Sequence, residues 1–157
     1  MTFPVVRRIV VGVDGSAESA AALRWACREA LLRGAEVHAV RAWEPPHRAV
    51  ASYACSARVP EQSGYVRDGT AGAEEDLRQM VQELAEPGLV IKVEVAEGLP
   101  ARVLLDRAVD ADMLVLGSAN HPAMRAAGPV VRACVSHAPC PVVVIGAEQA
   151  ARALVVT

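Results

Sequence analysis

The residues between Gly117 and Val130 have the types and spacing of a loop that holds an anion. An apolar run, MLVL, ends at Gly117 and Ser118, and a helix is predicted to open near Gly128 after a short loop. Backbone N–H groups of such a loop, together with a helix N-terminus, attract negative charge. The predicted chemistry is therefore the binding of a phosphate or another anion, and no catalytic group is assembled in the sequence.

Two residues of this loop work against a tight phosphate site. Asn120 stands where a phosphate cradle favours glycine; Asn tolerates left-handed backbone angles, but its side chain crowds a phosphate. Pro129 offers neither an N–H nor a hydroxyl at the helix opening. Each charge-assisted hydrogen bond lost in this way is worth roughly 1.5–3 kcal/mol, or about ten- to a hundredfold in affinity. We therefore expect phosphate to be held weakly.

Alternating strands and helices are predicted to position this loop. Short β-branched runs predict strands, and apolar residues at helical spacing predict the helices between them. The five predicted strands cover residues 8–13, 36–43, 90–95, 113–116 and 142–145, and the four helices cover 17–33, about 73–84, 98–109 and about 128–137. Because strand, helix and strand in this order form a right-handed parallel crossover, the predicted fold class is α/β. It is a doubly wound, open, five-stranded parallel sheet with helices on both faces.

The two most polar turns follow the first and fourth predicted strands. Ligands of such sheets bind beyond the carboxyl ends of the strands, where the strand order reverses, and we expect these two strands to be neighbours there. Their ends carry Asp14, Gly15 and Ser16 on one side and Gly117 to Asn120 on the other. Asp14 is either a turn and helix-cap carboxylate or a ligand group. The Gly117 turn either merely ends a strand or contacts a phosphate.

Composition and charge exclude several classes of protein. The 157 residues are interpreted as one domain, 1–157, with a formal net charge of -2. The Lys and Arg residues are scattered and aromatic residues are scarce, so nucleic acid is not an expected partner. No apolar stretch approaches the ~20 residues that span a membrane, and no signal segment is visible, so we expect no membrane association and a cytoplasmic location.

The remaining segments carry no predicted catalytic or metal chemistry. Residues 44–70 are rich in proline and glycine without periodicity, which predicts a long mobile connection within the domain, either a lid or a tolerated insertion. The four cysteines have no metal-type spacing and are interpreted as small buried or idle thiols, with a redox role at Cys55 as the alternative. Surface or loop positions without a carboxylate or cysteine partner are predicted for His38, His47, His121 and His137.

Four segments resemble the universal stress protein family. They are IVVGVDGS (9–16), VRAWEPP (40–46), ADMLVLGS (111–118) and, closest of all, SHAPCPVVVI (136–145). The resemblance covers nearly the whole chain and implies a five-stranded parallel sheet of the Rossmann-like, adenine nucleotide α-hydrolase-like type. Members that bind ATP carry a loop of the form Gly, two residues, Gly, nine residues, Gly, Ser or Thr.

The chain departs from that loop. Gly117 fills the first position, Asn120 replaces the second glycine, and only seven residues separate Asn120 from Gly128. Pro129 falls on the hydroxyl residue. By the same resemblance, Asp14 corresponds to an aspartate near the adenosine end of the nucleotide. The nucleotide-binding residues that the resemblance implies are Val13, Asp14, Gly15, Ala42, Gly117, Ser118, Asn120, Gly128, Pro129 and Val130.

The resemblance leaves two functions open. The first is a non-catalytic regulatory or binding module in stress response, with weak or absent ATP binding, that contacts a protein partner or senses another adenine compound such as adenosine or AMP. The alternative is an ATP-binding nucleotide sensor with slow hydrolysis, whose shortened loop refolds around phosphate and Mg²⁺. An enzyme of the wider α-hydrolase-like group would need an HxGH or SGGxDS motif, which the sequence lacks.

The resemblance also implies a homodimer. The predicted strand 142–145 and the apolar segment 153–157 are short runs that can pair across a two-fold axis by edge addition. The alternative is that the terminal segment folds back over the edge of its own sheet.

Overall fold

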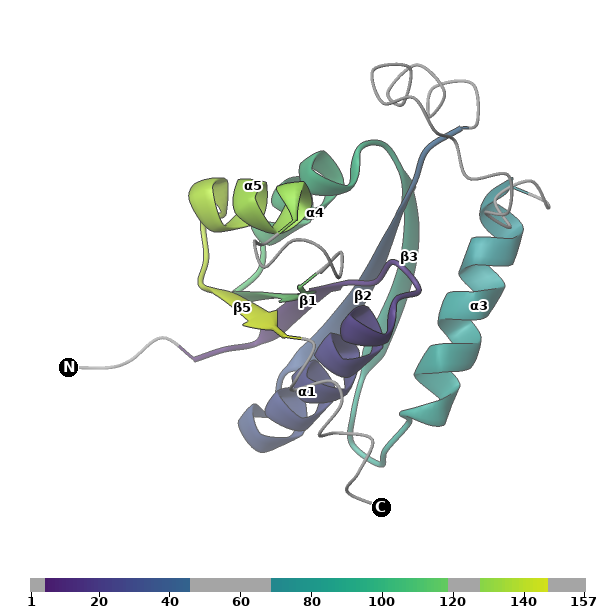
Figure 1. Cartoon of the computed structure of the whole chain (residues 1–157). Helices are drawn as coiled ribbons and strands as arrows, with labels where there is room; N and C mark the ends of the chain where they lie inside the picture. The colour runs from purple at the N-terminus through teal and green to yellow at the C-terminus, as the bar shows by residue number, and fades with distance from the viewer. Residues whose placement is uncertain (1–4, 46–68, 119–127, 147–157) are drawn as a thin grey trace.

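The computed structural model describes residues 5–45, 69–118 and 128–146 (Figure 1). Its elements in chain order are β1 (Arg8–Gly12), α1 (Ala17–Arg33), β2 (Glu36–Trp43), α3 (Gly69–Glu83), β3 (Ile91–Glu97), α4 (Pro100–Ala108), β4 (Met113–Gly117), α5 (Pro129–His137) and β5 (Val142–Ile145). Each predicted strand and helix is present. The largest difference in bounds is at α3, which begins at Gly69 rather than near residue 73.

The strands form one sheet in the order β3-β2-β1-β4-β5, and every pair is parallel. The chain first winds outward from β1 to β3 and then returns to place β4 on the other side of β1. The predicted contact between the first and fourth strands is therefore confirmed, with Val10 paired to Leu114. This doubly wound α/β sheet confirms the predicted fold class, and the strand order reverses between β1 and β4.

Helices cover both faces of the sheet, so its central strands are buried on both sides. Helices α1 and α3 lie on one face, and α4 and α5 lie on the other (Figure 1). Ile9 and Val11 belong to the core cluster that includes residues of α1 and α3, whereas Val10 belongs to the cluster that includes residues of α4 and α5. All three side chains are fully buried. Strands buried on both faces carry continuous apolar runs rather than an alternating pattern, which explains the sequence of β1 and β4.

The prediction that the histidines lack a carboxylate partner is wrong for His38. Its Nε2 lies 2.9 Å from Oε2 of Glu94, and the same carboxylate accepts from Nε of Arg107 at 2.9 Å. Burial lowers the pKa of His38, and the Glu94 carboxylate only partly offsets this. The contact depends on the register of β2 with β3, which brings together residues far apart in the sequence. His137 is exposed, as predicted, and His47 and His121 lie outside the described residues.

Several predictions fall outside the described residues. These are Asn120, Cys55, the terminal segment 153–157 and most of the connection 44–70, so the extent of the domain and the role of that connection stay predictions. Cys27 and Cys134 are buried, and burial raises the pKa of the Cys27 thiol to about 11. Among the residues described, no group of three or more His, Cys, Asp or Glu could hold a metal ion. In the same ranges, no helix is long and apolar enough to cross a membrane.

Candidate functional site

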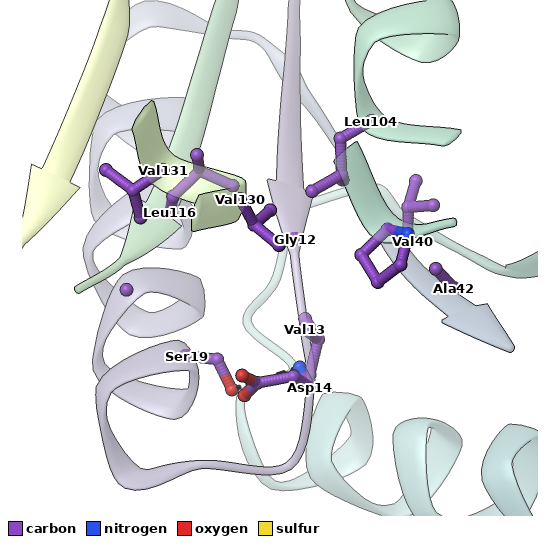
Figure 2. Close-up of a pocket in the computed structure, with 12 residues that line it drawn as sticks. Gly12, Val13, Asp14, Ser19, Val40, Ala42, Leu104, Leu116, Val130 and Val131 are labelled. Atoms are coloured by element: carbon purple, nitrogen blue, oxygen red, sulfur yellow. Dashed lines mark hydrogen bonds between the residues drawn. The ribbon is translucent and has the colours of Figure 1, made fainter. Parts of the chain in front are cut away.

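A cleft of about 610 Å³, its open mouth included, lies where the strand order reverses. Figure 2 shows its walls: β1 runs through the middle, β4 and α5 lie on one side, and β2 and α4 lie on the other. Without its open mouth, the cleft has a cavity volume of about 130 Å³, which is smaller than the roughly 300–1,000 Å³ of typical ligand pockets. Most of the lining is apolar, and its two polar side chains are Asp14 and Ser19.

The structure brings half of the predicted site residues to this cleft. Those that line it are Val13, Asp14, Ala42, Gly117 and Val130. Gly15, Ser118 and Pro129 are next to lining residues in the chain, and Gly128 is one residue further away, but none of the four lines the cleft. Asn120 is outside the described residues. The predicted convergence of the two polar turns is thus seen for Asp14 and Gly117. Their role in binding a ligand stays a prediction.

Seven lining residues were not predicted. They are Gly12, Ser19, Val40, Pro100, Leu104, Leu116 and Val131. Most are apolar residues that a sequence pattern assigns to the core, and the packing of α4 and α5 over the sheet exposes one side of them to the cleft. Pro100 could have been found from the sequence, because it lies at the start of a predicted helix and helix N-termini in this fold point to the ligand crevice.

Asp14 is held in a compact turn at the mouth of the cleft. Its Oδ1 accepts a hydrogen bond from the N–H of Ser16 at 2.8 Å, and its own N–H donates to Oγ of Ser19 at 3.3 Å. Gly15 takes a φ of 87°, which favours glycine. Burial raises the pKa of Asp14, but hydrogen bonds from Ser16 and Ser19 outweigh it and hold the pKa below its usual value. Asp14 is therefore both a turn carboxylate and an ionised acceptor beside the cleft.

The same turn caps helix α1. Oγ of Ser16 accepts from the N–H of Ser19 at 3.1 Å, and the Ser19 hydroxyl donates to the carbonyl of Ser16 at 3.0 Å. Side-chain caps of this kind stabilise a helix by about 1 kcal/mol. Because the cap fixes both ends of the turn, the Asp14 carboxylate is positioned before any ligand arrives.

Gly117 has a packing role that neither sequence interpretation included. A Cβ atom at this position would lie 2.5 Å from the carbonyl carbon of Glu18 and 2.6 Å from the nitrogen of Ser19. The first turn of α1 therefore lies directly against the end of β4. Only a residue without a side chain permits that approach, whatever the role of Gly117 toward a phosphate.

The anion-binding features of the cleft are few. Helix α5 opens with Gly128 as N-cap and Pro129 in its first turn, without a side-chain cap. Val130 and Val131 line the cleft, and as residues of the first turn of α5 their N–H groups have no partner within the helix. The Oγ of Ser118 is buried and has no hydrogen-bond partner among the described residues. Among the described residues that line the cleft, none is Lys or Arg.

Comparison with known proteins identifies the family. Residues 6–146 match the model of the Universal stress protein family. The chain belongs to this family. A universal stress protein of Mycolicibacterium smegmatis is 33% identical over 148 residues, an alignment that covers 91% of this chain and 49% of the relative. The chain thus spans about half the length of the curated relatives that it matches.

Two solved structures of universal stress proteins share the fold. UspA of Lactobacillus plantarum is 28% identical with a TM-score of 0.70, covering 91% of this chain and 99% of that one. The universal stress protein from Archaeoglobus fulgidus, solved in complex with dAMP, is 25% identical with a TM-score of 0.61, covering 90% and 99%. The Archaeoglobus protein was therefore captured with a nucleoside monophosphate.

Proposed function

We propose that this universal stress protein is a non-catalytic binding module in stress response whose cleft takes the adenosine part of an adenine compound and holds phosphates weakly. The observation that carries the proposal is the composition of the described lining, which is apolar with one carboxylate and no Lys or Arg. The complex of the Archaeoglobus fulgidus protein with dAMP supports an adenine ligand.

The walls of the cleft suit a nucleoside. Val40, Ala42 and Leu104 offer apolar surface to a flat base, and burial of that surface is worth roughly 25 cal/mol per Å². Asp14, with its lowered pKa, is ionised at neutral pH and can only accept hydrogen bonds. Ribose hydroxyls are donors of matching chemistry. We infer that Asp14 accepts from the sugar.

The donors for phosphate are too few for a triphosphate. The lining supplies the N–H groups of Val130 and Val131, and the Ser118 hydroxyl lies buried beside Gly117. Pro129 removes one N–H from the first turn of α5. Because the described part of the lining holds no cation, we expect these groups to balance about one phosphate, and the additional charge of ATP to stay with solvent.

Calorimetric titration tests the proposal. The purified chain, freed of co-purified nucleotide, is titrated with adenosine, AMP and ATP, with and without Mg²⁺. We expect adenosine and AMP to bind within about tenfold of each other and ATP no more tightly. Asp14→Asn keeps the oxygen that accepts from Ser16 but loses the charge, so adenosine affinity should fall about tenfold or more. Asp110→Asn, an exposed aspartate beyond α4, is the matched control.

Two outcomes would contradict this function. Mg²⁺-dependent ATP binding at least about tenfold tighter than AMP binding would favour the ATP sensor. The unpartnered Ser118 hydroxyl is the observation that keeps this second function open. Failure of every adenine compound to bind would instead favour a module that acts through a protein partner, with an unused crevice.

We also propose that the protein is a homodimer. Strand β5 is at the edge of the sheet and pairs only with β4 among the described strands. Its residues VVVI are apolar and partly exposed at three of four positions. An apolar edge of this kind is a template for pairing with a second copy. Light scattering should give twice the chain mass, and a monomer at micromolar concentration would contradict the proposal.

A further inference from the structure

Gly12 ends β1 at the centre of the cleft. Figure 2 shows it between Leu116 on one side and Leu104 on the other, and all three residues line the cleft. Its backbone does not require glycine, because its φ is not among the positive values of the described glycines. The reason for glycine at this position must therefore be space.

The space at Gly12 is limited by side chains that themselves line the cleft. A Cβ atom would lie 2.9 Å from Cδ2 of Leu116 and 3.0 Å and 3.2 Å from the two terminal carbons of Leu104. These are the ends of flexible side chains, which can give way. At Gly117, by contrast, a Cβ would meet backbone that cannot turn aside.

The direction in which the leucines can move is set by their burial. Leu104 is 5% exposed and Leu116 is 3% exposed, and the core beneath α4 and α5 surrounds them away from the cleft. Protein cores are close-packed, so their displaced ends have room only toward the cleft. A side chain at position 12 would therefore narrow the cleft both by its own volume and by the leucine ends that it displaces.

We propose that Gly12 is the specificity-determining residue of the cleft and sets the largest ring system that it accepts. This inference rests on the proposed function and refines it: a two-ring purine lies over the bare Cα of Gly12, against Leu104 and Leu116. Leu104 limits the cleft from the opposite wall, because truncation of its side chain enlarges the space above Gly12.

The test uses adenosine and its fluorescent analogue 1,N6-ethenoadenosine, whose base has a third fused ring. The full chain is titrated as wild type, Gly12→Ala, Leu104→Ala and the double variant. We expect Gly12→Ala to weaken adenosine binding by about ten- to two-hundredfold, the range for one misplaced methyl group in an apolar pocket. The double variant should regain most of this loss. Leu104→Ala should improve ethenoadenosine binding relative to adenosine.

The outcomes separate this inference from the proposed function. If the wild-type chain binds no adenine compound, the proposed function fails and the inference fails with it. If the wild type binds adenosine and a folded Gly12→Ala binds it equally well, the inference alone is overturned. Circular dichroism checks the fold of each variant. If Gly12→Ala fails to fold, the test uses the double variant, in which the contact with Leu104 is relieved. The double variant must then match wild-type adenosine binding, and a large loss of affinity overturns the inference.

Discussion

Gly117→Ala should destabilise the protein through a backbone clash. The new Cβ would lie 2.5 Å from the carbonyl carbon of Glu18, 2.6 Å from the nitrogen of Ser19 and 2.8 Å from the carbonyl oxygen of Glu18. Non-bonded carbon atoms prefer separations of about 3.5–4.0 Å, so β4 and α1 must move apart by about 1 Å. Neither β4 nor α1 can move without disturbing other contacts, because residues of both elements belong to the same buried core.

The magnitude follows from two opposing effects. Overpacking of a core costs about 1–3 kcal/mol, and a clash with backbone on a rigid helix belongs near the upper end. Alanine also lowers the conformational entropy of the unfolded chain, and this effect stabilises the folded protein by about 0.4–1 kcal/mol. The net loss is therefore about 2 kcal/mol. At about 2–4 °C per kcal/mol for a domain of this size, the midpoint of thermal unfolding should fall by about 4–8 °C.

Thermal unfolding followed by circular dichroism measures this shift, with Gly12→Ala as the matched control. The control also replaces a strand-end glycine at the cleft, but its Cβ meets only movable leucine side chains. The midpoint of Gly12→Ala should stay within about 3 °C of the wild type. Repacking of the leucines destabilises the folded state, whereas the lower conformational entropy of the unfolded chain stabilises it. An unchanged midpoint for Gly117→Ala, or a larger drop for Gly12→Ala, would refute the assignment of Gly117 to helix packing.

Two further predictions concern the phosphate loop and the far end of the sheet. Asn120→Gly combined with Pro129→Ser should raise ATP affinity by about ten- to a hundredfold per restored contact in calorimetric titration; no gain would show that the short spacing of the loop is limiting. Oδ2 of Asp112 accepts two backbone N–H groups at the start of β1, at 2.8 Å and 3.0 Å, and these hydrogen bonds lower the pKa of Asp112. Because the folded state favours its ionised form, its contribution to stability is full above about pH 4 and is lost as the pH falls through the lowered pKa. The difference in unfolding midpoint between Asp112→Ala and wild type should therefore shrink from pH 7 to pH 3, and a constant difference would contradict this role.

The sheet could be predicted from the sequence because its signals are local. The β-branched run at Ile9–Val11, the turn at Asp14–Ser16 and the glycine at position 34, which ends α1 with a φ of 67°, each specify their own conformation. The neighbouring positions of β1 and β4 follow from the rules for winding parallel strands. The family resemblance implied the same five-stranded parallel sheet, and the match to the family model supports the resemblance.

Residue patterns alone could predict the cleft only at its polar turns, whereas Ala42 and Val130 were named from the family resemblance. Asp14 and Gly117 are recognisable because turn residues follow strands, whereas Leu104 and Leu116 look like any core residue. Their contact with the cleft depends on how α4 leans over the sheet, which no local pattern records. For the same reason the contact of His38 with Glu94 was missed: it requires the register of two strands that are joined by more than forty residues.

The proposed binding mode divides the cleft into a nucleoside half and a phosphate half, which differ in what they contribute to folding. The nucleoside half is built from residues of the core, such as Leu104 and Leu116, so a change there affects stability as well as binding. The phosphate half depends on the loop that leads into α5, where Pro129 is exposed and no side chain caps the helix. Substitutions in that loop can therefore remove phosphate contacts at little cost to the fold. Under the proposed function, this separation explains how the chain can retain a nucleoside-binding cleft while its phosphate loop departs from the pattern of ATP-binding members.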